Sequence, residues 1–333
     1  QGLIGSVLRS NLFVQPVGDE GTWLRYHHLF RDFLQARLIE EQPDEEKHIL
    51  RRLATVYIKR NQWENAHALY QRLGDISSTA DLIETAGPSL VKGGQLSTLA
   101  DWLDGLPSAT LNSRPSLLSL QGVVATNLGE VERGLFLQNR AEATFREMND
   151  EPRLAQALLE RAVANRFLGN YQASEADADE AMVIAIGNES LRNVHAEALR
   201  AKGMSLYQLG HLNDAIDWLK ESLAAYDRLD DTHRVAMLLM ELGTAYERAG
   251  HYDLALDHHE RALSYWRRMD NVVQQANLLN NLGVVYHLRG DYEGASSLLE
   301  EALTCARQSG YTRLEGFTLA SIGDLYVDLE APD

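Results

Sequence analysis

Two adjacent histidines, His27 and His28, are the residues whose type most readily suggests chemistry, because imidazole serves as a metal ligand and as a general acid or base. They lie among aromatic and basic residues in the stretch Gly21–Leu34. Two ligands on one helical face need a spacing of three or four residues, whereas neighbours point about 100° apart. The spacing implies no paired nucleophile or carboxylate either. The pair therefore predicts neither a metal site nor a catalytic site.

Composition narrows the classes of function. The 333 residues include 31 Lys and Arg against 48 Asp and Glu, a formal net charge of −17, and we find no basic patch for nucleic acid. No apolar run is long enough to span a membrane, the single Cys305 cannot form an internal disulfide, and the N-terminus lacks a signal-peptide layout. We expect a soluble, cytoplasmic protein. Gln1 in place of methionine, and an end within a helical pattern, favour a piece of a longer chain.

A period of about 40 residues organises most of the chain. Leu242–Leu263 and Leu282–Leu303 match at Leu-Gly, Tyr, Gly, Tyr, Ala and Ala-Leu. Small residues fill four slots of the repeat. These are the first glycine slot (Gly203, Gly243, Gly283, Gly323), the turn glycine slot (Gly129, Gly169, Gly210, Gly250, Gly290) and two further slots (Gly134, Ser174, Ala215, Ala255, Ala295; Ala141, Ala181, Ser222, Ala262, Ala302).

Each unit predicts a helix, a tight turn and a second helix, because apolar residues fall at helical spacing on both sides of the turn glycine. Glycine tolerates the positive φ that ends the first helix. Small residues in the other slots let two helix backbones approach closely. The Asp- and Asn-containing breaks Met148–Pro152, Leu229–His233 and Met269–Val273 can cap the helix that follows each of them.

This pattern resembles the tetratricopeptide repeat, in a version with about 40 rather than 34 residues per unit, most clearly from Lys202 to Leu303. The resemblance implies an all-α, right-handed α-solenoid whose first helices line a concave face. We expect divergent helical repeats over 43–107 and tetratricopeptide repeats over 108–333. The expected units lie near 108–149, 150–189, 190–230, 231–270, 271–310 and, truncated, 311–333.

The N-terminal residues have a different pattern. Asn11–Val17 and Thr22–Tyr26 are β-prone, the intervening residues favour a turn, and an amphipathic helical pattern follows. A hairpin followed by a helix is typical of the C-terminal part of a winged-helix domain, here 1–42. Its "NLF", "W-L-R-Y-H-x-L-F" and "F-L-x-x-R-L" elements resemble the winged helix of MalT-like regulators, which are large ATP-binding members of the LuxR family among the signal-transduction ATPases with numerous domains (STAND).

That resemblance implies a nucleotide-binding module before this point and often a DNA-binding domain at the end. Because no GxxxxGK[ST] phosphate loop occurs in the sequence, we expect no cofactor and no enzymatic activity in this chain, with ATP or ADP held elsewhere in the full-length protein. By resemblance, the "H-x-L-F" element assigns His27 a contact with the phosphate of ADP. The alternative is a helix-start histidine whose partners are backbone groups.

In tetratricopeptide arrays, the positions six and three before the first glycine slot, and one, four and five after it, face the groove. The amides, aromatics, thioethers and arginines at these positions suit a polar ligand with apolar parts. The candidate ligand-binding residues are Glu197, Arg200, Tyr207, Met240, Glu247, Arg248, Asn277, Asn280, His287, Phe317 and Asp324, and the same frame also selects Met204, Gln208, Met237, Thr244, Val284 and Leu288.

Three asparagines in five residues, Asn277, Asn280 and Asn281, weaken a helix unless their side chains have partners. They predict either ligand contacts or hydrogen bonds between repeats. His258 and His259, on a second helix, are expected at the surface, and Cys305 is expected to pack.

Two functions remain open. The first is the sensor arm of a MalT-like STAND ATPase, in which an inducer on the concave face releases the autoinhibited ADP state and permits oligomerisation. Its partners would be the inducer and the missing nucleotide-binding module. The second is a tetratricopeptide scaffold that binds a trigger or inhibitory protein, because solenoids offer long surfaces and an acidic one favours basic partners.

Overall fold

The computed structural model describes residues 14–17, 23–41 and 43–330. The chain forms two compact units, 1–110 and 111–333, and each has its own hydrophobic core. The predicted all-α fold, a solenoid of helix pairs with a hairpin and a helix at its N-terminal end, is confirmed. Among the described residues no helix is both long and apolar enough to cross a lipid bilayer.

The first unit begins with an antiparallel hairpin of β1 (Val14–Val17) and β2 (Trp23–Tyr26), followed by α2 (His28–Glu41). This confirms the predicted hairpin and helix, although the "NLF" element and the turn lie outside the described residues. Two helical hairpins and a short helix complete the unit. These are α3 (Pro43–Lys59) with α4 (Trp63–Leu73), α5 (Ile76–Lys92) with α6 (Leu96–Asp104), and α7 (Ser108–Ser113), which contains the boundary.

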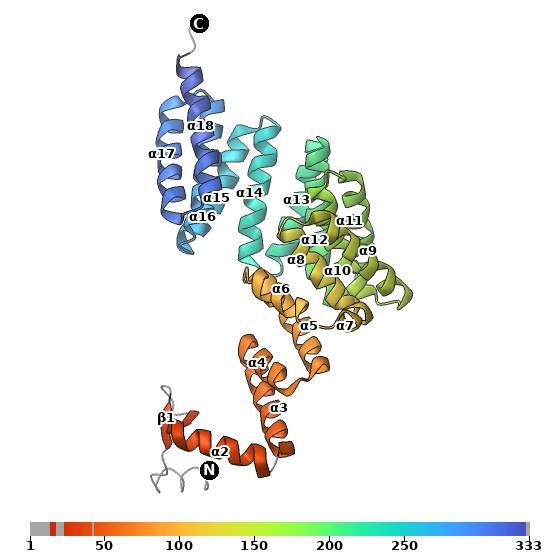
Figure 1. Ribbon diagram of the computed structural model, residues 1–333. Helices are drawn as coiled ribbons and strands as arrows, with labels where there is room; N and C mark the ends of the chain where they lie inside the picture. The colour runs from red at the N-terminus through yellow and green to blue at the C-terminus, as the bar shows by residue number, and fades with distance from the viewer. Residues whose placement is uncertain (1–13, 18–22, 42, 331–333) are drawn as a thin grey trace. The chain divides into compact units, whose positions relative to one another are not determined.

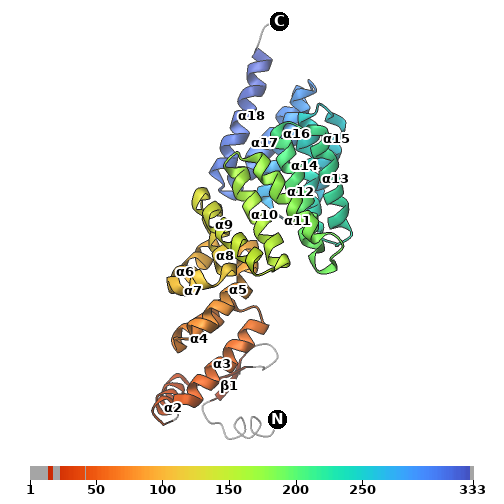
Figure 2. The ribbon, with the colours of Figure 1, turned by 90° about the vertical axis from the view of Figure 1, so that its right-hand side faces the viewer.

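The second unit consists of helix pairs packed in chain order, visible in Figures 1 and 2. The first helices of the pairs are α8 (Pro115–Asn127), α10 (Glu151–Phe167), α12 (Arg192–Leu209), α14 (Thr232–Arg248), α16 (Val272–Leu288) and α18 (Thr312–Glu330). The second helices are α9 (Val131–Glu147), α11 (Tyr171–Ala185), α13 (Leu212–Asp227), α15 (Tyr252–Arg268) and α17 (Tyr292–Ser309), and a short 3-10 turn, Glu189–Leu191, precedes α12.

The turns between paired helices adopt the predicted conformation. All five turn glycines have positive φ, from +78° at Gly169 and Gly250 to +92° at Gly129. Between repeats the chain reverses at residues with φ near +53°, and the Asp231 side chain then accepts a hydrogen bond from the Arg234 amide. Asn271 caps α16 in the same way through the Gln274 amide. The turns and the helix caps of the repeat thus follow directly from the local sequence.

The first glycine slot allows the helices of a pair to touch. A Cβ on Gly203 or Gly283 would lie within 2.9 Å of a leucine side chain on the second helix, and one on Gly243 would lie 2.5 Å from the ring of His259. His259 occupies the position that leucine holds in the neighbouring repeats and is fully buried, so the expectation of a surface histidine was wrong. Its helix face meets the partner helix rather than solvent.

Candidate ligand-binding site

A cavity of about 250 Å³ opens among three successive first helices, α12, α14 and α16. Figure 2 shows these helices in order after α10. We call this side of the first helices the inner face. Its lining combines thioethers, an aromatic ring, a hydroxyl, a carboxylate and two amides. The lining residues are Met204, Tyr207, Met240, Glu241, Thr244, Asn277 and Asn281.

In the part of the chain that the structure describes, the asparagines of α16 lack partners that would give them a structural role. Among the described residues, no side-chain hydrogen bond is made by Asn277, Asn280 or Asn281, and the Asn280 Oδ1 atom is buried without a partner. The hydrogen bonds between repeats that could have accounted for them are therefore not formed. Asn277 and Asn281 instead present unpaired amides at the cavity wall, where a ligand can hydrogen-bond to them.

Arg200, a candidate from the sequence, is already engaged within the chain. Its Nε and Nη2 atoms lie 2.9 and 2.5 Å from the two carboxylate oxygens of Glu241 on α14, and its Nη1 lies 2.6 Å from Glu197 Oε1. These partners raise the pKa of Arg200 despite its burial. Arg200 thus connects two neighbouring repeats beside the cavity. Its partner Glu241 is one of the residues that line the cavity.

Glu197 is also held by partners. The Tyr226 hydroxyl donates to its Oε2 over 2.7 Å, and Arg234 Nη1 lies 3.3 Å from the same oxygen. Burial alone would raise the pKa of Glu197, but the charges of Arg200 and Arg234 and the hydrogen bond from Tyr226 outweigh burial and lower it. Glu197 therefore stays ionised and helps to hold Arg200 in place.

Glu247 differs, because no cation pairs with it among the described residues. Burial raises the pKa of Glu247 to about 7, so its carboxyl group is partly protonated near neutral pH and can donate a hydrogen bond. Its neighbour Arg248 lies over the Tyr207 ring, 4.9 Å from the centroid, and donates to the Tyr207 carbonyl at 3.2 Å. Arg248 thereby supports one wall of the cavity.

The remaining candidates lie outside the cavity lining. His287 Nε2 is 2.7 Å from Asp328 Oδ2, which links α16 to α18. Phe317 and Asp324 are exposed on α18, where Arg313 lies over the Phe317 ring. In the other unit, His27 is an exposed residue just before α2, and its carbonyl accepts a hydrogen bond from the Arg31 amide. Its contact with ADP stays a prediction, and the described residues offer no phosphate loop for a nucleotide.

The groove-facing positions predicted from the repeat left out one position on the inner face. Glu241 and Asn281 occupy it, two residues before the first glycine slot, and both line the cavity. The sequence singled out Asn281 only as part of the run of asparagines. A charged or amide residue there, directly before the buried leucine that precedes the glycine, was the available signal.

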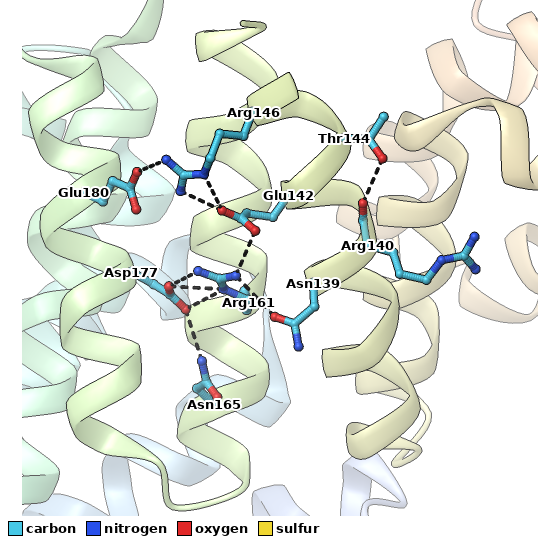
Figure 3. A network of polar contacts seen from close by, with 9 residues as sticks. All are labelled: Asn139, Arg140, Glu142, Thr144, Arg146, Arg161, Asn165, Asp177 and Glu180. Atoms are coloured by element: carbon cyan, nitrogen blue, oxygen red, sulfur yellow. Dashed lines mark hydrogen bonds and ion pairs between the residues drawn. The ribbon is translucent and has the colours of Figure 1, made fainter. Parts of the chain in front are cut away.

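A second polar network lies on α9, α10 and α11 (Figure 3). Arg161 binds Asp177 through Nε at 3.1 Å and Nη2 at 2.6 Å, and Asn165 donates to the same carboxylate at 3.0 Å. Glu142 joins the network 3.3 Å from Arg161. Because the charged groups satisfy one another, this network stabilises packing rather than offering a vacant site. The described residues also contain no cluster of His, Cys, Asp and Glu that could hold a metal.

The sequence comparisons agree with this architecture. Residues 1–46 match the MalT winged helix domain, and residues 194–268 and 234–308 match the tetratricopeptide repeat. The chain is thus MalT-like, a winged-helix segment followed by a tetratricopeptide-repeat solenoid, a kind of scaffold that is typically non-catalytic. The HTH-type transcriptional regulator MalT of Vibrio campbellii is 27% identical over 150 residues, which cover 45% of this chain and 17% of that protein.

Two solved structures share the fold. One is a STAND protein with a tetratricopeptide repeat sensor from Pyrococcus horikoshii, with a TM-score of 0.74 and 17% identity over 97% of this chain and 48% of that one. The other is a Rap protein complexed with Competence and Sporulation Factor, with a TM-score of 0.64 and 15% identity over 86% of this chain and 87% of that one. Because the sequence identities are only 17% and 15%, these two similarities indicate a shared fold and nothing more specific.

Proposed function

We propose that this chain is the ligand-recognition part of a MalT-like STAND regulator and that its ligand binds in the cavity among α12, α14 and α16. The observation that carries the proposal is the pair of unpaired amides, Asn277 and Asn281, in a cavity that also contains thioethers and an aromatic ring. Amides orient a polar ligand through hydrogen bonds, while Met204, Met240 and Tyr207 cover its apolar parts.

A ligand in this cavity touches three repeats at once, so it favours the arrangement of first helices that fits it best. Differential affinity for two arrangements is what shifts a conformational equilibrium. In the full-length cytoplasmic regulator, the inducer-bound solenoid would favour the open state over the autoinhibited ADP-bound state, which His27 helps to hold, and would permit oligomerisation. This chain itself would contribute recognition, while nucleotide chemistry and DNA binding would belong to other modules.

A protein ligand is the second candidate, and the Rap complex with Competence and Sporulation Factor favours it because that fold matches 86% of this chain. A trigger or inhibitory protein would lay a segment along the same inner face. Its side chains would then enter the cavity that we assign to an inducer.

Thermal unfolding of the chain with a panel of polar metabolites tests the proposal. At least one metabolite should raise the midpoint, and the double variant Asn277→Leu/Asn281→Leu should abolish the rise. Asn193→Leu, on an exposed position of α12, serves as the matched control and should respond like the wild type. If no small molecule binds while a protein is captured on the inner face, the second candidate replaces the first.

A further inference from the structure

Arg166 is a half-buried arginine in the last turn of α10. In α10 the first glycine slot holds Ala162, and Arg166 follows it by four residues. Tyr207 on α12 and Glu247 on α14 occupy the same place in their repeats, so Arg166 belongs to the inner face. Within the described ranges Arg166 forms no ion pair and no side-chain hydrogen bond, and its Nη1 atom is buried and unsatisfied.

Arg200, the cation whose charge acts on Arg166, already has partners of its own. Arg200 binds Glu241 and Glu197, and Arg234 also reaches Glu197. The two carboxylates whose charge attracts Arg166, Glu241 and Glu197, are therefore already bound to other arginines. Burial, and then repulsion from Arg200, lower the pKa of Arg166, and the attraction of Glu241 and Glu197 only partly offsets this. A guanidinium that has lost water without gaining a partner is destabilising.

Such a group is satisfied when an anion fills the place of the missing carboxylate. Guanidinium presents a planar fork of donors that binds carboxylate or phosphate through two parallel hydrogen bonds, and its hydration shell is weaker than that of an ammonium group. The helix α10 packs against α12, which contributes Met204 and Tyr207 to the cavity, and the charge of Arg200 on α12 acts on Arg166. A ligand that extends from the cavity across α12 can therefore reach α10 as well.

We propose that Arg166 binds an anionic group, a carboxylate or a phosphate, of the ligand on the inner face. This rests on the proposed function and defines its ligand class: an acidic group at α10 and a neutral polar part at the asparagines of α16. An acidic side chain of a protein ligand could occupy the same position.

The test uses the whole 333-residue chain with inorganic phosphate and with acetate, against chloride at equal ionic strength. One of the two oxyanions, at about ten times its dissociation constant, should raise the midpoint of thermal unfolding by about 2–4 °C, and Arg166→Met should remove that rise. Which oxyanion acts distinguishes phosphate from carboxylate ligands. The control Arg153→Met lies on the same helix and removes an exposed arginine paired with Asp150, so it should keep the rise.

Two outcomes would overturn the inference. One is an oxyanion response that is absent, or equal in the wild type and Arg166→Met. The other is a lower midpoint of Arg166→Met in chloride, because an unpaired buried charge should cost stability and its removal should leave the midpoint unchanged or raise it. The double variant Asn277→Leu/Asn281→Leu should keep its oxyanion response, so failure of the cavity proposal and failure of this inference give different results.

Discussion

Arg200 on α12 and Glu241 on α14 form a two-pronged ion pair between neighbouring repeats, with Nε to Oε2 at 2.9 Å and Nη2 to Oε1 at 2.5 Å. Both side chains are largely buried, at 13% and 12% exposure. Because Glu241 also lines the cavity, the pair fixes the spacing of the two helices that form the site. Recognition and the stability of this part of the solenoid therefore depend on the same contact.

Arg200→Met should lower the free energy of unfolding by about 3 kcal/mol, because it leaves the Glu241 carboxylate buried without its partner. Urea unfolding measures the change. The control Arg133→Met removes an exposed pair with Glu130, and its effect should stay below about 1 kcal/mol. Similar losses in the two variants would contradict the role of the Arg200–Glu241 pair.

His259→Leu should stabilise the chain at pH 7 by about 1–2 kcal/mol, because both ring nitrogens of the buried histidine lack partners among the described residues. Leucine already fills the equivalent place beside Gly203 and Gly283. Chemical unfolding at neutral pH measures the difference. A destabilised variant would show that the imidazole makes a contact that leucine cannot replace.

The same histidine predicts a dependence on pH. Burial, with a smaller effect of His258, lowers the pKa of His259 from 6.5 to about 4 in the folded state. Between these values the unfolded chain binds the extra proton, so stability is fully present above about pH 6.5 and falls by about 3 kcal/mol as the pH drops to 4. His259→Leu should remove this contribution, and unfolding curves measured from pH 4 to 7 would reveal it. An unchanged pH profile would contradict it.

Gly243→Ala should destabilise the chain by about 2 kcal/mol, because the new methyl group would lie 2.5 Å from the His259 ring. Gly316→Ala is the matched control on α18, since a Cβ there would meet nothing within 4 Å. The control should be neutral or gain up to about 1 kcal/mol from helix propensity. Thermal unfolding of both variants distinguishes close packing from the general effect of replacing a helical glycine.

Glu247→Gln should increase stability relative to the wild type at pH 8.5 but not at pH 4. The folded-state pKa of Glu247 is raised from 4.5 to about 7 by burial, so the folded chain holds a proton that the unfolded chain releases, and stability falls as the pH rises through this window. Allowing for partial exposure, we expect a gain of about 1 kcal/mol. Thermal unfolding midpoints at the two pH values measure it, and an equal gain at both would contradict the protonation argument.

The turns and helix caps of the repeat were predictable because they depend on local conformation. Glycine at the turns and Asp or Asn before each first helix determine φ and capping within a few residues, and Gly250 and Asp231 show both features as expected. The N-terminal hairpin and α2 were predictable for the same reason, from two β-prone runs on either side of turn residues and from the helical spacing of the apolar residues that follow.

The pairing of side chains between repeats was not predictable from the period. Whether Arg200 faces solvent or Glu241 depends on the stagger of α12 against α14, which the packing of whole helices determines. The surface position expected for His259 was wrong because that expectation placed it on the outer side of a second helix, whereas it faces the first helix, where Gly243 leaves room for its ring. The unpaired Arg166 could be recognised only once the partners of its neighbours were known.

Calorimetric titration of a metabolite that raises the thermal midpoint is the most direct test of the cavity among α12, α14 and α16. We predict one binding site in the wild type, a loss of affinity of at least tenfold in Asn277→Leu/Asn281→Leu, which is about 1.4 kcal/mol, and unchanged affinity in Asn193→Leu. Equal affinity in all three proteins would contradict the assignment of the ligand to this cavity.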